Sequence, residues 1–210
     1  MKNNIQPNET SLIEAAQCGD LDAFNQLVLN FQDMMYRIAL RTLNDESAAE
    51  DAAQNAMIQA FRNIKSFRGG SFRSWLARVT VNASYDEMRR WRRQPSVSLE
   101  QVNSDGEEIE SLPWLVDLSA GPEDCFETVE LKDAIQSCVK SLIPDYRLVV
   151  VLVDMEGMSY EEAARVANIP VGTVKSRLAR ARGQLRKAMQ SYRNLLPTAY
   201  QMNMPAYASV

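Results

Sequence analysis

Apolar residues recur every three or four positions along most of this chain, which predicts helices, and the clearest pattern lies toward its C-terminal end. Ser159 followed by Glu162 predicts a capping box, so a short helix should run from Tyr160 to about Ala167. Pro170 should end this helix, because proline favours an extended residue before it. A second helix is therefore expected to start near Val171.

The second of these helices combines one apolar stripe with a basic, hydrogen-bonding surface. The stripe consists of Val174, Leu178, Ala181, Leu185 and Met189. No acidic residue lies on the other faces, which hold Thr173, Lys175, Ser176, Arg177, Arg180, Arg182, Arg186 and Lys187. Two helices, a tight turn and a basic second helix are typical of a helix-turn-helix that enters the DNA major groove. The alternative is a solvated basic helix packed against a neighbour.

The same spacing predicts helices upstream and gives an all-α fold class. The expected helices are 11–18, one from Asp20 or Asp22 to Leu43, 47–64, 73–93, 126–142 and one from Pro144 to Gly157. Residues 66–72 should form a loop, because two glycines lie between Phe67 and Phe72. We therefore expect two small helical domains, 1–94 and 126–193, the second a four-helix domain that contains the helix-turn-helix.

The charge pattern supports this division. The net charge of the whole chain is −4, but residues 62–93 carry +7 and residues 165–193 carry +8. Residues 94–130 carry −10 and contain three prolines. This composition predicts a flexible acidic linker over 95–125, and two basic blocks predict two nucleic-acid contacts. The uncharged tail, 194–210, is expected to be disordered.

Composition excludes several other classes of protein. The longest apolar runs are too short to cross a membrane, and the polar N-terminus has no hydrophobic stretch typical of a secretory signal. Histidine is absent and the three cysteines are far apart, so we expect no metal, no cofactor, no disulfide framework and no catalytic residue. The expected compartment is the cytoplasm.

Two surfaces have both a functional and an ordinary interpretation. Aromatic residues alternate with arginines in the helix 73–93, which suits stacking on single-stranded bases, but Trp75 and Tyr85 could equally be core residues. In the helix 47–64, acidic residues near the start could complement the helix dipole or belong to an interface. Periodicity alone leaves these alternatives open.

Three motifs in order resemble the extracytoplasmic-function (ECF) sigma factors, the small promoter-specificity subunits of bacterial RNA polymerase. AEDAAQNAMIQAFR at 49–62 is similar to the family's polymerase-clamp-binding helix, and residues 67–93 to its element that melts and reads the −10 promoter region. Residues 142–187 resemble its −35-reading domain. The resemblance covers about 10–93 and 126–190, separated by a linker where the family has one.

The resemblance implies roles for specific residues. It places Asp51, Gln54 and Asn55 against the polymerase β′ coiled coil, with Asn55 standing where the family usually has an acid. It assigns −10 recognition and melting to Phe67, Arg68, Ser71, Phe72, Arg73, Trp75, Arg78, Asn82, Arg89 and Arg90. It assigns −35 recognition to Val171, Gly172, Thr173, Lys175, Ser176, Arg177 and Arg180.

The partners implied by the resemblance are core RNA polymerase, through its β′ coiled coil and β flap, promoter DNA and an anti-sigma factor, without insertion of this chain into a membrane. Such a protein makes no covalent bond and is not an enzyme. Two alternatives remain at this point: a conventional helix-turn-helix regulator whose first domain senses a ligand or dimerises, and a nuclease. The first predicts repression without any need for core polymerase, and the second predicts metal-dependent turnover.

Overall fold

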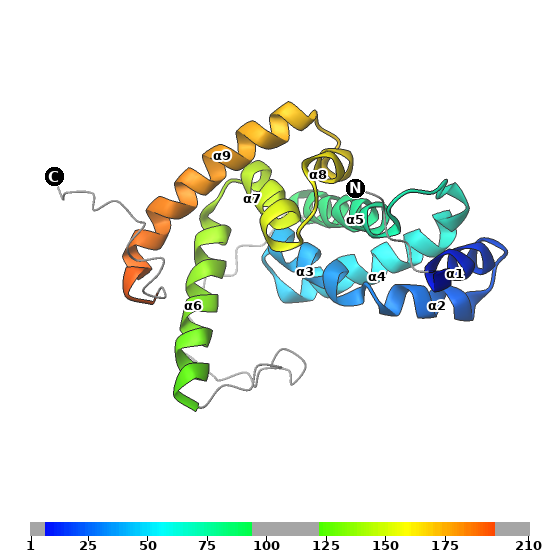
Figure 1. Ribbon diagram of the computed structural model, residues 1–210, viewed down its shortest axis with the longest axis horizontal. Coiled ribbons are helices and arrows are strands. Elements are labelled where there is room, and N and C mark those ends of the chain that lie inside the picture. Colours follow the sequence, from blue (N-terminus) through cyan, green and yellow to red (C-terminus); the bar gives the residue numbers. More distant parts are fainter. Residues whose placement is uncertain (1–6, 94–121, 196–210) are drawn as a thin grey trace.

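The computed structural model describes residues 7–93 and 122–195, and all regular structure within them is helical (Figure 1). The all-α prediction is therefore confirmed. The first domain contains α1 (Pro7–Gln17), α2 (Leu21–Leu29), α3 (Gln32–Leu43), α4 (Glu46–Asn63), the 3-10 turn η1 (Ile64–Ser66) and α5 (Phe72–Arg93). The second contains α6 (Pro122–Ser141), α7 (Pro144–Val150), the π-helical turn η3 (Val151–Met155), α8 (Tyr160–Ala167), α9 (Val171–Ala188) and η4 (Met189–Leu195). Within these ranges, none of the helices has the length and apolarity needed to cross a bilayer.

Helix α5 is the central element of the first domain, because it packs against both α3 and α4 and reaches the second domain through α8 (Figure 1). Helix α4 turns an alanine-rich face to these neighbours, formed by Ala48, Ala49, Ala52, Ala53, Ala56 and Ala60, all buried. Small side chains let adjacent helix backbones approach closely, and the larger side chains of the neighbours fill the space between them. Leu76 and Val81 of α5 and Met35 and Ile38 of α3 supply that volume, and each is at most 1% exposed.

The predicted single helix from Asp20 or Asp22 to Leu43 is wrong, because the chain turns at Asn30 and Phe31 and forms α2 and α3. The two shorter helices have different neighbours: α2 packs on α1, whereas α3 packs on α4 and α5. The turn also brings the Phe31 ring to 5.8 Å from the Phe72 ring. Contacts made far away in the sequence thus override an uninterrupted helical pattern.

Helix α6 begins at Pro122, four residues inside the stretch that the sequence predicted to be linker and ahead of the predicted start at Phe126. Proline is well tolerated at the first position of a helix, because its missing N–H would have no intrahelical partner there. The same rule correctly predicted Pro144 at the start of α7. The remainder of the predicted linker and the tail from 196 lie outside the described residues.

The helix-turn-helix forms as predicted. Ser159 accepts a hydrogen bond from the Glu162 amide, and the Glu162 carboxylate accepts one from the Ser159 amide, which completes the capping box. Asn168 then adopts a left-handed conformation, with φ of 54°, and ends α8. Asparagine tolerates this conformation better than most residues, so the turn into α9 is made without a glycine.

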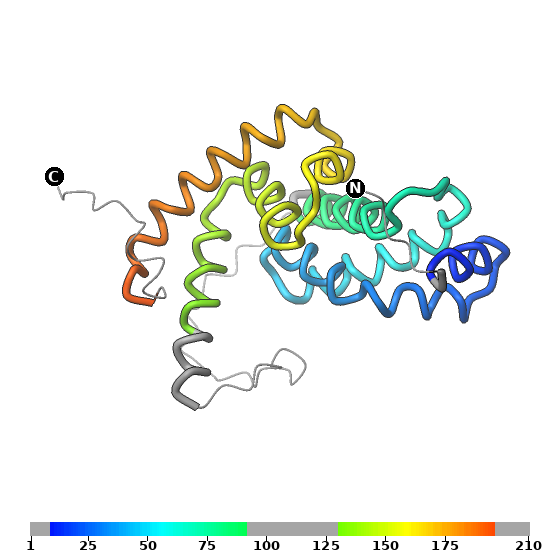
Figure 2. The backbone as a smooth tube through the Cα atoms, viewed as in Figure 1, coloured from blue at the N-terminus to red at the C-terminus, as the bar shows by residue number. Residues whose placement is uncertain are grey.

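The two domains pack directly against each other, which the sequence did not predict (Figure 2). Helix α8 lies on α5, and α7 and η3 lie on α3. Buried side chains from both domains form one continuous apolar cluster. Ser74 of α5 also donates a hydrogen bond of 2.8 Å to the Glu162 carboxylate, so the capping residue of the helix-turn-helix also joins the domains.

This arrangement makes stability depend on pH through Glu162. Burial by itself would raise the pKa of this carboxyl, but hydrogen bonds from the Ser159 amide and from the hydroxyls of Ser74, Ser159 and Ser71 hold the pKa below its ordinary value. A carboxyl whose pKa is lower in the folded state stabilises that state fully above its unfolded pKa, and the contribution disappears as pH falls through the lower, folded pKa.

We therefore predict that Glu162→Gln lowers the free energy of unfolding at pH 7 and that the difference from the unmodified chain shrinks toward pH 3. Urea unfolding at both pH values measures this difference. Glu161→Gln is the matched control, because Glu161 is the exposed neighbour in the same first turn. An equal loss for Glu162→Gln at pH 7 and pH 3 would contradict the assignment.

Candidate nucleic-acid interface

Helix α9 presents one buried and one exposed surface. Val174, Leu178 and Ala181 are at most 2% exposed and anchor the helix in its domain. Among the residues predicted to contact DNA, Val171, Thr173 and Arg177 are half-buried, whereas four are exposed: Gly172, Lys175, Ser176 and Arg180. The predicted reading surface is therefore open to solvent while the two domains are packed together.

Several of these side chains are oriented by contacts within the second domain. The guanidinium of Arg177 pairs with the Asp145 carboxylate of α7 at 2.6 Å, and the Lys175 ammonium lies 5.8 Å from the centre of the Tyr160 ring. Ser176 donates to the carbonyl of Thr173. Arg177 is thus already engaged in this structure and would have to leave Asp145 to contact a base.

The loop between η1 and α5 is held in place by aromatic residues. Gly69 and Gly70 have φ of 94° and 91°, conformations that favour glycine. Phe67 and Phe72 are 7% and 1% exposed, and their ring centres are 5.4 Å apart. Both rings also pack against Trp75, which is half-buried.

Phe67 and Phe72 are thus buried in this structure, and the assignment of −10 recognition to them stays a prediction. Each of the two rings packs against other aromatic side chains. The accessible parts of the loop are Arg68, the backbone of the two glycines and the half-buried Ser71. A base captured here would therefore meet a guanidinium, backbone groups and a hydroxyl.

Farther along α5, the predicted DNA-contacting residues Arg78, Asn82, Arg89 and Arg90 are exposed. Two of them form ion pairs along the helix, Arg89 with Asp86 at 2.6 Å and Arg90 with Glu87 at 2.8 Å. Asn82, Tyr85 and Arg89 line a groove of about 420 Å³ whose other wall contains Pro144, Val166, Ala167 and Asn168 of the second domain. The second domain therefore restricts access to this part of α5.

The predicted polymerase-binding residues lie on the outer face of α4. Asp51 and Gln54 are exposed and Asn55 is half-buried. Gln54 belongs to a groove of about 550 Å³ between α3 and α4, lined by Gln32, Asp33, Tyr36, Glu50, Ala53, Gln54 and Met57. Burial raises the pKa of the Tyr36 phenol, and the neighbouring Glu46 and Glu50 raise it further. This groove faces solvent with an acidic rim.

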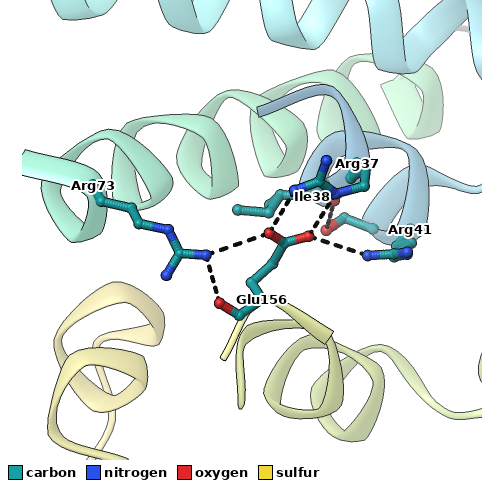
Figure 3. Close-up of polar contacts among 6 residues, drawn as sticks. Arg37, Ile38, Arg41, Arg73 and Glu156 are labelled. Atoms are coloured by element: carbon teal, nitrogen blue, oxygen red, sulfur yellow. Dashed lines mark hydrogen bonds and ion pairs between the residues drawn. The ribbon is translucent and has the colours of Figure 1, made fainter. Parts of the chain in front are cut away.

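A buried carboxylate on the second domain is bound by three arginines of the first. The Glu156 side chain is 1% exposed and lies between Arg37, Arg41 and Arg73 (Figure 3). Arg37 donates through both Nε and Nη2, each at 3.0 Å, and Arg41 donates through Nη1 at 3.1 Å. Nη2 of Arg73 lies 3.5 Å from the carboxylate and also donates to the Glu156 carbonyl.

The three guanidinium groups outnumber the acidic group they surround. The hydrogen bond to Glu156 raises the pKa of Arg37, whereas burial lowers the pKa of Arg41; the ordinary pKa of arginine is so high that both remain charged. Three positive charges thus face one negative charge at the junction between α3, α5 and the end of η3. This cluster, Arg37, Arg41, Arg73 and Glu156, is hereafter the arginine cluster.

Sequence reasoning missed Arg37, Arg41 and Glu156 as functional candidates and found only Arg73. Arg37 and Glu156 are 119 positions apart, so no local spacing links them. One signal was present in the sequence. The apolar run 148–153 is followed by Asp154 and Met155, and Glu156 comes next, just before Gly157. A carboxylate so close to a buried segment is a candidate for burial with a cationic partner.

Comparison with known proteins identifies both domains. The family described as Sigma-70 region 2 matches residues 27–94, and the family described as Sigma-70, region 4 matches residues 132–185. The chain is 36% identical over 187 residues to the RNA polymerase sigma-H factor of Pseudomonas aeruginosa, covering 88% of this chain and 95% of the relative. It is 35% identical over 187 residues to the ECF RNA polymerase sigma-E factor of Escherichia coli K12, covering 88% and 96%.

A solved structure, the sigma factor RpoE from Bartonella quintana in complex with the anti-sigma factor NepR, matches with a TM-score of 0.60 and 25% identity, covering 81% of this chain and 98% of that chain. The likeness of the fold and the sequence relationship therefore lead to the same answer. The chain belongs to the extracytoplasmic-function family of RNA polymerase sigma factors, which direct transcription initiation.

Proposed function

We propose that the second domain, 126–193, reads the −35 element in duplex DNA and that the first domain, 1–94, binds core RNA polymerase and opens and reads the −10 element. The observation that carries this division is the exposed basic front of α9 on a capped helix-turn-helix. Gly172, Lys175, Ser176 and Arg180 can approach base edges and phosphates without any rearrangement of their own domain.

The −10 surface of this proposal consists of the loop 68–71 and the exposed side of α5. Arg68, Arg78 and Arg89 offer charge to the phosphates, and Asn82 offers an amide to a base edge. The rings of Phe67, Phe72 and Trp75 pack against one another and stabilise the conformation of the loop. Opening of base pairs costs a few kcal/mol for each unstacked base, which the captured bases and the polymerase contacts must offset.

The polymerase surface of this proposal is the outer face of α4 with the adjoining groove. The acidic rim, with Asp33 and Glu50, and the exposed Asp51 of α4 support docking of a basic helical element, which the resemblance names as the β′ coiled coil. The solved relative bound to an anti-sigma factor supports a further proposal, that an anti-sigma factor also binds this chain and blocks its access to polymerase.

The packed arrangement cannot contact both promoter elements at once. The −35 and −10 positions are about 25 base pairs apart, and at about 3.4 Å for each base pair this corresponds to about 85 Å. In this structure α5 and α8 touch. The domains must therefore separate on the promoter, and a connection of 28 residues between α5 and α6, if fully extended, reaches about 95 Å. We infer that the packed form is the resting state of the free chain.

The test of the proposed function is co-elution of the full chain with sigma-free core RNA polymerase. We predict that the unmodified chain co-elutes and that Asp51→Lys weakens its affinity about tenfold or more, because a lysine would repel a basic partner. Glu14→Lys is the matched control, since it makes the same charge change at an exposed position of α1. Failure of the unmodified chain to co-elute, while it still binds duplex DNA, would favour the conventional regulator.

For the −35 surface, we predict that Arg180→Ala relaxes the base preference at one position and lowers discrimination there by about 1–3 kcal/mol. Selection of bound sequences from a randomised duplex by the polymerase complex measures this preference. Arg182→Ala is the control, because its guanidinium pairs with Asp154 of its own domain. An equal loss of affinity for all DNA sequences would contradict this prediction and would indicate that Arg180 contacts a phosphate and not a base.

A further inference from the structure

The arginine cluster has the composition of an anion-binding site on the first domain. Three guanidinium groups, all from α3 and α5, converge on a single carboxylate supplied by the other domain. Arg37 and Arg41 lie one turn apart on α3, and Arg73 lies in the first turn of α5 (Figure 3). If the second domain leaves, these cations remain together and lose their only shared anion among the described residues.

The geometry suits a phosphate as well as a carboxylate. Arg37 binds Glu156 in a fork, with its Nε and Nη2 each 3.0 Å from a different carboxylate oxygen. The guanidinium fork matches the oxygen spacing of both carboxylate and phosphate, and arginine is favoured wherever either group is recognised. Glu156 therefore occupies this site as a phosphodiester would, with one negative charge and two accepting oxygens.

The position of the site indicates which phosphate it would meet. Arg73 lies in the first turn of α5, two residues after Ser71, so the site adjoins the loop 68–71 of the proposed −10 surface. The acidic groove adjoins the site on its other side, since Asp33 lies one turn before Arg37 on α3 and helps to raise the pKa of Arg37. Arg73 is thus the member of the cluster that connects the site with the proposed −10 surface.

We propose that Arg37, Arg41 and Arg73 bind a backbone phosphate of promoter DNA once the domains separate, and that Glu156 occupies the same site in the packed form. This inference rests on the proposed function, because it requires the domains to separate on DNA. The carboxylate and the phosphate exclude each other, so DNA binding at this site stabilises the open form. The packed form in turn neutralises part of the positive surface of the free chain.

The test compares Glu156→Gln with the unmodified full chain, using a fluorescently labelled mixed-sequence duplex without polymerase. Phosphate contacts are independent of sequence, so no promoter is needed. Glu156→Gln removes the carboxylate charge that the three arginines share, and we expect about fivefold or more tighter binding at low salt. The slope of log affinity against log salt concentration should steepen by about 0.9 for each phosphate gained. Glu161→Gln makes the same charge change at an exposed position, and we expect it to change the affinity and the salt slope less than Glu156→Gln does.

A second substitution distinguishes a phosphate site from a mere contact between the domains. In the Glu156→Gln background, Arg41→Gln leaves no unpaired buried carboxylate at the cluster, and it should reverse most of the gain in affinity and slope. Arg62→Gln, at an exposed position of α4, is the control in the same background. Retention of the full gain by Glu156→Gln/Arg41→Gln would overturn the proposal, as would the absence of any gain in Glu156→Gln.

A gain in affinity for core polymerase without a change in the DNA slope would instead assign the arginines to a protein carboxylate, and would also overturn the proposal. The proposed function fails by a different measurement, the co-elution of the unmodified chain with core polymerase. The two outcomes are therefore separable.

Discussion

The arrangement of the two domains depends on the buried Glu156 carboxylate. A carboxylate that is removed from water must be paired with cations, because an unpaired buried charge is very costly. Removing one partner of such a cluster is costly, whereas the complete cluster contributes little more than a well-packed apolar contact would, because both charges lose their hydration. The Arg37 side chain is also 42% exposed, which weakens its share through solvent screening. The cluster therefore decides which surfaces pair, while the continuous apolar core supplies most of the attraction. The contact between Glu156 and the three arginines is specific, but another anion can still take the place of Glu156.

Local features of the fold could be predicted from the sequence because their causes are local. The Ser159–Glu162 capping box, the proline start of α7 and the apolar stripe of α9 each depend on residues within a few positions of one another. The break between α2 and α3 could not be predicted in this way. Neither proline nor glycine marks it, and it exists because Phe31 packs on a ring 41 positions later. The packing of the two domains is equally non-local, since opposite charges far apart in the sequence give no periodic signal.

In the candidate site, too, features with local causes could be predicted and features with non-local causes could not. Charge and spacing correctly identified an exposed basic surface on α9 and exposed polar residues on α5, because solvent-facing positions follow from helical periodicity. Spacing could not show that Phe67 and Phe72 are buried, because burial of an aromatic ring in a glycine-containing loop depends on its three-dimensional neighbours. The pairing of Arg177 with Asp145 likewise connects two helices that the sequence pattern treats separately.

The central claim is that the free chain rests with its domains in contact and separates them on polymerase. Spin labels on the exposed Cys18, directly after α1, and on a cysteine replacing Lys187 of α9 allow the distance between the domains to be measured. Cys125→Ser and Cys138→Ala remove the other thiols. Our account predicts a narrow distribution of distances in the free chain and a shift to distances tens of ångström longer when core polymerase and promoter DNA are bound. A broad distribution in the free chain, or an unchanged distance in the complex, would contradict it.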